Sequence, residues 1–137
     1  ARGGRIGDLA KTGGWQVSGE RAMYVLSYYL PTARLHAEWG RVFTHEDMDV
    51  TLQLLSKGYP NAINFTLVCD QKLGSPGGCT DERDIAKSNE DVLKLVSFHP
   101  QFVSASEKVY KNSPTRLEVT CQWQACLNEG MRKRESV

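Results

Sequence analysis

Three segments of this chain alternate apolar and polar residues with a period of two, and this pattern limits the fold more than any other feature. The segments are residues 32–39, 61–69 and 115–124. Because successive side chains of a strand point to opposite faces, each segment is predicted to be a strand with one buried face and one wet face. A fourth strand, at about 101–110, is predicted to form a hairpin with 115–124 across a turn at 111–114.

Helices are predicted between these strands, where apolar residues recur at helical spacing. One runs from about Ser18 to Leu30, a second begins at Thr44 and ends at Gly58, and a third begins at Ser88. The hydroxyl residues at the three starts are suitable N-caps. Together these elements predict an α+β fold. We expect a two-layer sandwich in which helices pack on one face of a largely antiparallel sheet of about four strands, while the other face is open to water.

The length of 137 residues fits a single domain. Residues 1–14 are Gly-rich and predict a flexible N-terminal arm, 15–127 the α+β domain, and 128–137 a polar C-terminal tail. With 17 basic and 16 acidic residues, the charge balance argues against nucleic acid as the partner. No apolar run approaches the ~20 residues that a membrane-spanning helix needs. We expect a monomer.

The four cysteines are an even number, which favours disulfides. Cys69 and Cys121 lie on the apolar faces of their strands, so both are expected to point into the core. We favour Cys69–Cys121 with Cys79–Cys126, and the alternative is two local bridges, Cys69–Cys79 and Cys121–Cys126. Free buried thiols and a structural zinc site are further alternatives.

Three features predict a secreted, extracellular protein. They are the even cysteine count, a glycosylation sequon at Asn64 and a chain that begins at Ala1 without an initiator Met. The third is typical of a processed product, for example after removal of a signal peptide.

One enzymatic hypothesis uses the wet face of the sheet. Arg34, His36 and Glu38 project together from residues 32–39, and Arg116 with Glu118 from the last strand. His and Glu can act as acid and base, and Arg can stabilise the charge of a phosphorane-like transition state. This predicts a metal-free, ribonuclease-like enzyme; the alternative is a solvated face of paired charges.

His36 and Glu38 also form a His-x-Glu motif, and Cys69 and Cys79 follow it. This order is similar to that of zinc-dependent nucleobase deaminases, which use His-x-Glu and then Pro-Cys-x-x-Cys. The resemblance implies zinc held by His36, Cys69 and Cys79, with Glu38 moving protons. The chain departs from the family because its Pro-Cys-x-x-Cys run is absent.

The leading hypothesis is a small secreted binding module that resembles effector and toxin proteins (virulence factors) as a class. It would recognise another protein, for example a host or receptor protein, through a surface patch on the wet sheet face or the 70–78 loop. We expect no cofactor and no bound metal. The residues expected to bind the partner are Tyr24, Tyr28, Lys72 and Gln122.

Overall fold

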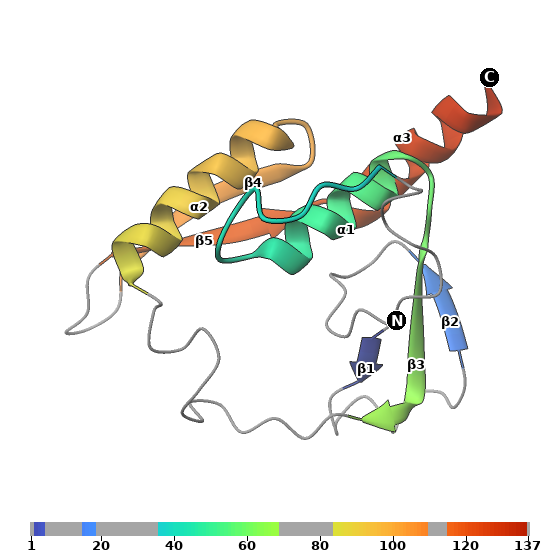
Figure 1. Ribbon diagram of the computed structural model, residues 1–137, viewed down its shortest axis with the longest axis horizontal. Coiled ribbons are helices and arrows are strands. Elements are labelled where there is room, and N and C mark those ends of the chain that lie inside the picture. The colour runs from blue at the N-terminus through green and yellow to red at the C-terminus, as the bar shows by residue number, and fades with distance from the viewer. Residues whose placement is uncertain (1, 5–14, 19–35, 69–83, 110–114, 137) are drawn as a thin grey trace.

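The structure is a computed structural model, and it describes residues 2–4, 15–18, 36–68, 84–109 and 115–136. Three helices and five strands lie in these ranges (Figure 1). In chain order they are β1 (Arg2–Gly4), β2 (Trp15–Ser18), α1 (Glu46–Ser56), β3 (Asn61–Val68), α2 (Ile85–Phe98), β4 (Val103–Lys108), β5 (Arg116–Cys121) and α3 (Trp123–Glu135). The predicted mixed α+β class is confirmed.

The described strands form two small sheets. In the first, β3 is central, with β1 parallel on one side and β2 antiparallel on the other. In the second, β4 and β5 form an antiparallel hairpin. The predicted single sheet of about four strands is not found among the described residues, because β3 pairs with segments near the N-terminus and not with the hairpin. Residues 2–4 accordingly belong to a strand, where a flexible arm was expected.

The hydrophobic core lies where the three helices meet the β4–β5 hairpin. In Figure 1, α1 and α2 lie beside the hairpin and α3 continues from β5 toward the C-terminus. Each of α1, α2, β4 and α3 contributes fully or nearly fully buried side chains to this core. They are Leu52, Leu55, Leu95, Val103, Cys126 and Leu127.

The hairpin follows the predicted alternation, and β5 places Leu117, Val119 and Cys121 on its half-buried face. The strand ends at Cys121, so the predicted continuation to residue 124 is wrong. Helix α3 follows and runs to Glu135, so residues 128–135 of the predicted polar tail are helical. The reason is an apolar stripe at helical spacing that begins with Trp123 and includes the buried Cys126, Leu127 and Gly130.

Two glycines let α1 and α3 approach closely. Gly58 follows α1 in the left-handed region, with φ +78°, and faces Gly130 of α3. A Cβ on Gly130 would lie 2.2 Å from the carbonyl oxygen of Leu55 and 2.5 Å from the amide nitrogen of Gly58. Arg134 completes the contact, because its guanidinium donates to the carbonyl oxygen of Gly58 at 3.0 Å.

The predicted helix starts need correction. The N-cap of α1 is His45 and not Thr44, whose hydroxyl is used elsewhere. Helix α2 begins before Ser88 because Asp84 caps it, accepting a hydrogen bond from the amide of Ala86 at 2.7 Å. Ser18, the predicted first cap, is the last residue of β2.

Residues 36–45 form an irregular loop, which we call the 36–45 loop, and not the predicted strand. His36 lies in a turn with φ +52°, which breaks any strand at that point. Residues 32–35 and the predicted helix after Ser18 fall outside the described residues.

Candidate functional site

The 36–45 loop is fixed to the helices by three buried or nearly buried side chains, and Gln53 of α1 is the first. Its carboxamide bonds both main-chain groups of Glu38: the Glu38 amide donates to Gln53 Oε1 at 2.7 Å, and Gln53 Nε2 donates to the Glu38 carbonyl at 2.8 Å. This pair of bonds imitates one rung of a sheet, so it holds an irregular segment as a neighbouring strand would.

Asp49 of α1 is the second fixing point and lies at the centre of a buried ionic cluster. Arg41 from the loop donates from Nε to Asp49 Oδ2 at 2.8 Å and from a terminal nitrogen to Oδ1, which is a bidentate pair. His99 at the end of α2 places Nε2 2.7 Å from Asp49 Oδ1 and 3.3 Å from Arg41. The shorter contact indicates that Nε2 donates to the carboxylate. Gln53 donates to Oδ2 at 3.0 Å.

The cluster keeps Asp49 ionised. Burial is the largest single influence and opposes ionisation, but the hydrogen bonds and charges of Arg41 and His99 together outweigh it. They hold the pKa of Asp49 at about 2, below its usual 3.8. The same carboxylate raises the pKa of Arg41. The loop is therefore fastened to α1 by a pair that stays charged over the whole neutral range.

Asp91 of α2 is the third fixing point. Its Oδ2 accepts from the Phe43 amide at 3.0 Å, from the Thr44 amide at 2.7 Å and from the Thr44 hydroxyl at 3.1 Å. Burial tends to raise the pKa of Asp91, but the bonds from Thr44 and Phe43 and the charge of Lys94 lower it overall. One carboxylate thus satisfies the main chain just before α1 begins.

Between these fixing points the loop displays aromatic side chains. Trp39 and Phe43 are 37% and 40% exposed, and Phe98, at the end of α2, is 43% exposed. Two cations lie over these rings: the Arg41 guanidinium is 4.3 Å from the centroid of Phe98, and Lys87 Nζ is 3.9 Å from that of Phe43. Exposed aromatic rings at fixed positions are typical of a contact surface.

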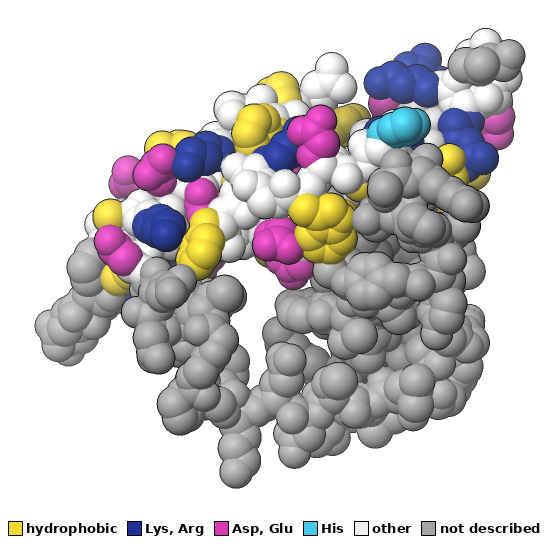
Figure 2. Space-filling view, viewed as in Figure 1, with side chains coloured by type: hydrophobic (Ala, Val, Ile, Leu, Met, Phe, Trp, Pro, Cys, Tyr) yellow, Lys and Arg dark blue, Asp and Glu magenta, His cyan; other side chains and the backbone are white. Residues whose placement is uncertain are grey.

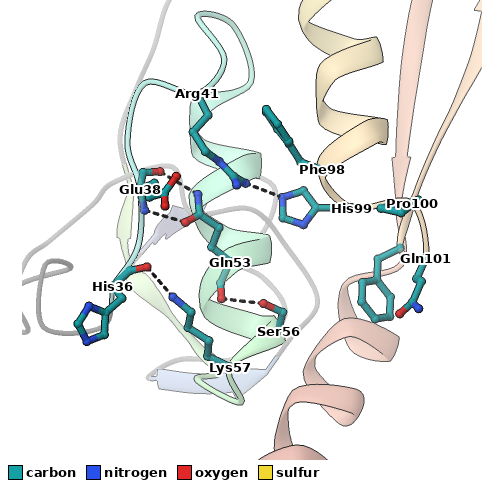
Figure 3. A pocket seen from close by; sticks show the side chains of 11 residues that line it. His36, Glu38, Arg41, Gln53, Ser56, Lys57, Phe98, His99, Pro100 and Gln101 are labelled. Carbon is teal, nitrogen blue, oxygen red and sulfur yellow. Dashed lines mark hydrogen bonds between the residues drawn. The ribbon is translucent and has the colours of Figure 1, made fainter.

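A groove of about 490 Å³ runs beside the loop (Figure 3). Its walls come from three places: the start of the loop, the C-terminal half of α1 and the turn between α2 and β4. The side chains that characterise it are Glu38, Arg41, Gln53, Lys57, Phe98 and Gln101. This volume falls in the range of ligand-binding clefts, and the lining combines polar side chains with the rings of Phe98 and Phe102.

The structure separates the residues that the ribonuclease hypothesis places together. His36 and Glu38 line the groove, but the His36 imidazole points away from Arg41 and His99 (Figure 3). Arg116 and Glu118 line a second cavity, of about 560 Å³, between the start of α2 and β5. Glu118 there accepts from Lys108 at 2.7 Å. Arg34 lies outside the described residues.

The surface predicted from the sequence is only partly described. Tyr24, Tyr28 and Lys72 lie outside the described residues. Gln122 is exposed and is the N-cap residue of α3. Figure 2 shows acidic, basic and apolar side chains interspersed over α1 and α2, so this face carries no large patch of one charge.

Two cysteines are described, and both are free thiols. Cys126 is fully buried and donates from Sγ to the Leu52 carbonyl at 3.6 Å, while Cys121 is half-buried at the end of β5. Burial raises the pKa of Cys121 to about 12 and that of Cys126 to about 11. The local bridge between them is therefore not formed. Cys69 and Cys79 lie outside the described residues, so pairing with them gains no support and stays a prediction.

The zinc hypotheses likewise stay predictions. Within the part of the chain that the structure describes, no three His, Cys, Asp or Glu side chains are grouped so as to hold a metal ion. The same ranges contain no helix that is long and apolar enough to cross a membrane.

Sequence reasoning missed the two aspartates that organise this region. The Asp91 side chain crosses from α2 to the 36–45 loop. His99 ends α2 as a buried cap residue. The available signal was the position of Asp49 and Asp91 among apolar residues on the inner faces of their helices, because a buried acid needs donors.

Comparison of the chain with protein-family models, with curated proteins and with solved structures finds no match.

Proposed function

We propose that this chain is a binding protein that recognises a partner protein through the 36–45 loop. The observation that carries the proposal is the combination of a fixed backbone with exposed aromatic rings. Three helix side chains, Asp49, Gln53 and Asp91, hold the loop at four of its residues. On the same segment the side chains of Trp39 and Phe43 are partly exposed.

The physical argument is one of preorganisation. A loop that is ordered before binding loses little conformational entropy when the partner arrives, so its contacts contribute more fully to affinity. Large aromatic rings and arginine dominate the free energy of protein interfaces. Trp39 and Phe43 of the loop supply such rings, and Arg41 connects the loop to the ring of Phe98 at the end of α2.

The groove beside the loop extends the proposed surface. Glu38 and Lys57 line it with one charge of each sign, Lys57 Nζ donating to the His36 carbonyl, and Gln101 can donate and accept. A polar rim around aromatic anchors is the usual anatomy of an interface. A protruding polar side chain of the partner would fit this groove, and an apolar patch would cover the rings.

The test compares matched alanine variants in affinity capture from an extract of the source material. Trp39→Ala and Phe43→Ala are expected to lower recovery of a captured protein at least about tenfold, because hot-spot truncations cost ~1.4 kcal/mol or more. Leu93→Ala is the control, since Leu93 is 59% exposed on α2 and takes no part in holding the loop. Equal recovery by all three variants would refute the proposal.

Secretion and effector- or toxin-like action are part of this proposal, and a mass comparison tests them. Oxidised protein from its natural source is expected to be 4 Da lighter than reduced protein if two disulfides form, by the loss of two hydrogens per bridge. The two free thiols described above favour no bridge. Identical masses would remove the disulfide argument for secretion.

The ribonuclease-like enzyme stays as the alternative, favoured by one observation: His36 and Glu38 line the same groove. It predicts RNA cleavage that is lost in His36→Ala with the fold retained. The binding function predicts that His36→Ala leaves any background RNA turnover unchanged.

A further inference from the structure

The outer edge of β4 offers main-chain groups to a further strand. The β4–β5 register pairs Val103 with Cys121 and Lys108 with Arg116, and just before β4 the Gln122 amide donates to the Phe102 carbonyl at 2.8 Å. Bonded pairs alternate along an antiparallel ladder. Even-numbered residues of β4 therefore bond to β5, while Ala105 and Glu107 direct their N–H and C=O groups outward.

The opposite edge of the hairpin is closed, and this supports the assignment. Leu117 lies opposite Glu107 in the ladder, so its main-chain groups point away from β4. Its amide donates to Asn89 Oδ1 of α2 at 2.9 Å. Asn89 Nδ2 donates to the Thr115 carbonyl at 3.1 Å. One carboxamide thus replaces a neighbouring strand at the start of β5. No main-chain bond of this kind is recorded for Ala105 or Glu107 among the described residues.

Strand β4 has few of the features that normally protect an edge. It contains no proline, its register has no bulge, and all five residues from Ser104 to Lys108 are exposed. Natural sheets block such edges with prolines, bulges or charged side chains, and the charges of β4 lie only at its end, in Glu107 and Lys108. An unprotected edge of small residues, Ser104, Ala105 and Ser106, leaves room for a second backbone at strand spacing.

We propose that this edge pairs with β4 of a second copy of the chain, antiparallel and centred on Ser106, to form a four-stranded sheet across a twofold axis. In this register Ala105 lies opposite Glu107 of the second copy, and each such pair exchanges two main-chain bonds. The twofold axis makes two such pairs, so four bonds form in total. The sequence alone predicts a monomer, and the open edge changes that expectation.

Two observations favour a second copy in this register. The Val103 amide already donates to the His99 carbonyl at 2.9 Å, so a register centred on Ala105, which pairs Val103 with Glu107, would lack one donor in each copy. Centring on Ser106 sets Glu107 opposite Ala105 and Lys108 opposite Ser104, so no like charges face each other.

The test is cysteine cross-linking of the full chain, with non-reducing electrophoresis as the readout. On the twofold axis the two Ser106 residues form a non-hydrogen-bonded pair with Cα atoms about 4.5 Å apart, which a disulfide can bridge. Ser106→Cys is expected to give at least about tenfold more covalent dimer than wild type. Ser104→Cys is the matched control, because its two copies would lie about 14 Å apart, four residues along the strand.

Sedimentation over a range of protein concentrations supplies a second measurement. Wild type is expected to shift toward dimer at high concentration, and Ala105→Pro to remain monomeric with an unchanged circular dichroism spectrum. Proline is tolerated where the lost N–H faces outward from an edge. Equal cross-linking of the two cysteine variants, or a monomer at every concentration, would overturn the proposal. Both results are independent of the 36–45 loop.

Discussion

Asp49 shows how one buried residue can fix a whole surface segment. Its carboxylate is almost fully buried, yet it receives donors from Arg41, Gln53 and His99. A buried carboxylate without donors would be strongly destabilising, because its desolvation would be uncompensated. Each donor comes from a different part of the chain: the 36–45 loop, α1 itself and the end of α2. The residue therefore links three segments through one charge.

Asp49→Asn is expected to lower the free energy of unfolding mainly above pH 4. The pKa of Asp49 in the folded protein, about 2, lies below the ordinary 3.8. The ionised form therefore adds stability that is complete above the unfolded pKa and is lost as the pH falls from about 4 to about 2. The difference in pKa corresponds to roughly 2 kcal/mol.

Urea unfolding of wild type and Asp49→Asn at several pH values measures this contribution. The gap in unfolding free energy should be widest near neutrality and should narrow toward pH 2. A gap that is constant with pH would show that the charge of Asp49 does not hold the loop.

At the scale of elements, the 36–45 loop is irregular, yet several of its main-chain polar groups have hydrogen-bond partners, as they would in a helix or a strand. Helix side chains bond the amide and carbonyl of Glu38 and the amides of Phe43 and Thr44. Helix side chains thereby perform what a partner strand does in a sheet, and the loop keeps a defined path between α1 and α2.

Asp91→Ala is expected to release one end of this loop. It would leave the amides of Phe43 and Thr44 without their acceptor, at a cost of about 1–3 kcal/mol. Hydrogen exchange should show faster exchange at these two amides, while amides in the middle of α1 keep their protection. Unchanged protection at Thr44 would mean that another group holds this end of the loop.

Gly130→Ala is expected to separate α1 from α3. The added methyl would lie 2.2 Å from the Leu55 carbonyl oxygen, and backbone atoms cannot move aside as a flexible side chain can. We expect a loss of about 2 kcal/mol or more, despite the better helix propensity of alanine. Met131→Ala, at the next and exposed position, is the control for chemical denaturation. Equal midpoints for the two variants would contradict the close contact.

The elements were predictable where one face of each carries a regular pattern. β3, α2 and the β4–β5 hairpin follow from such patterns, with boundaries shifted by a few residues. The continuation after Cys121 was not predicted correctly, because Cys121 and Trp123 also fit a period of two, and the helical stripe becomes evident only with Leu127 and Gly130. The site depended on contacts from Asp49 and Asp91 to a distant loop, and no local pattern encodes such contacts.

At the scale of the whole molecule, the main core joins the three helices to one hairpin. Leu52 and Leu55 from α1, Leu95 from α2 and Leu127 from α3 meet there. The carboxylates that hold the 36–45 loop belong to two of these helices, so the proposed recognition surface depends on the core for its shape.

Leu55→Ala is expected to weaken the entire domain. Leu55 is fully buried where the core helices meet, and such truncations cost about 2–5 kcal/mol. Far-ultraviolet circular dichroism and tryptophan fluorescence should lose signal together at a lower denaturant concentration, since Trp123 packs against the same core. Leu93→Ala, which is exposed on α2, should unfold like wild type. Separate transitions would contradict a single cooperative core.

The 36–45 loop is tied to α1 through Gln53 and Asp49 and to α2 through Asp91. Its two ends are therefore anchored on different helices, and any sliding of one helix against the other must stretch or slacken the span between them. Conversely, a partner that pulls on Trp39 or Phe43 transmits that force to both anchors at once. Displacement of the loop is therefore coupled to the distance between α1 and α2.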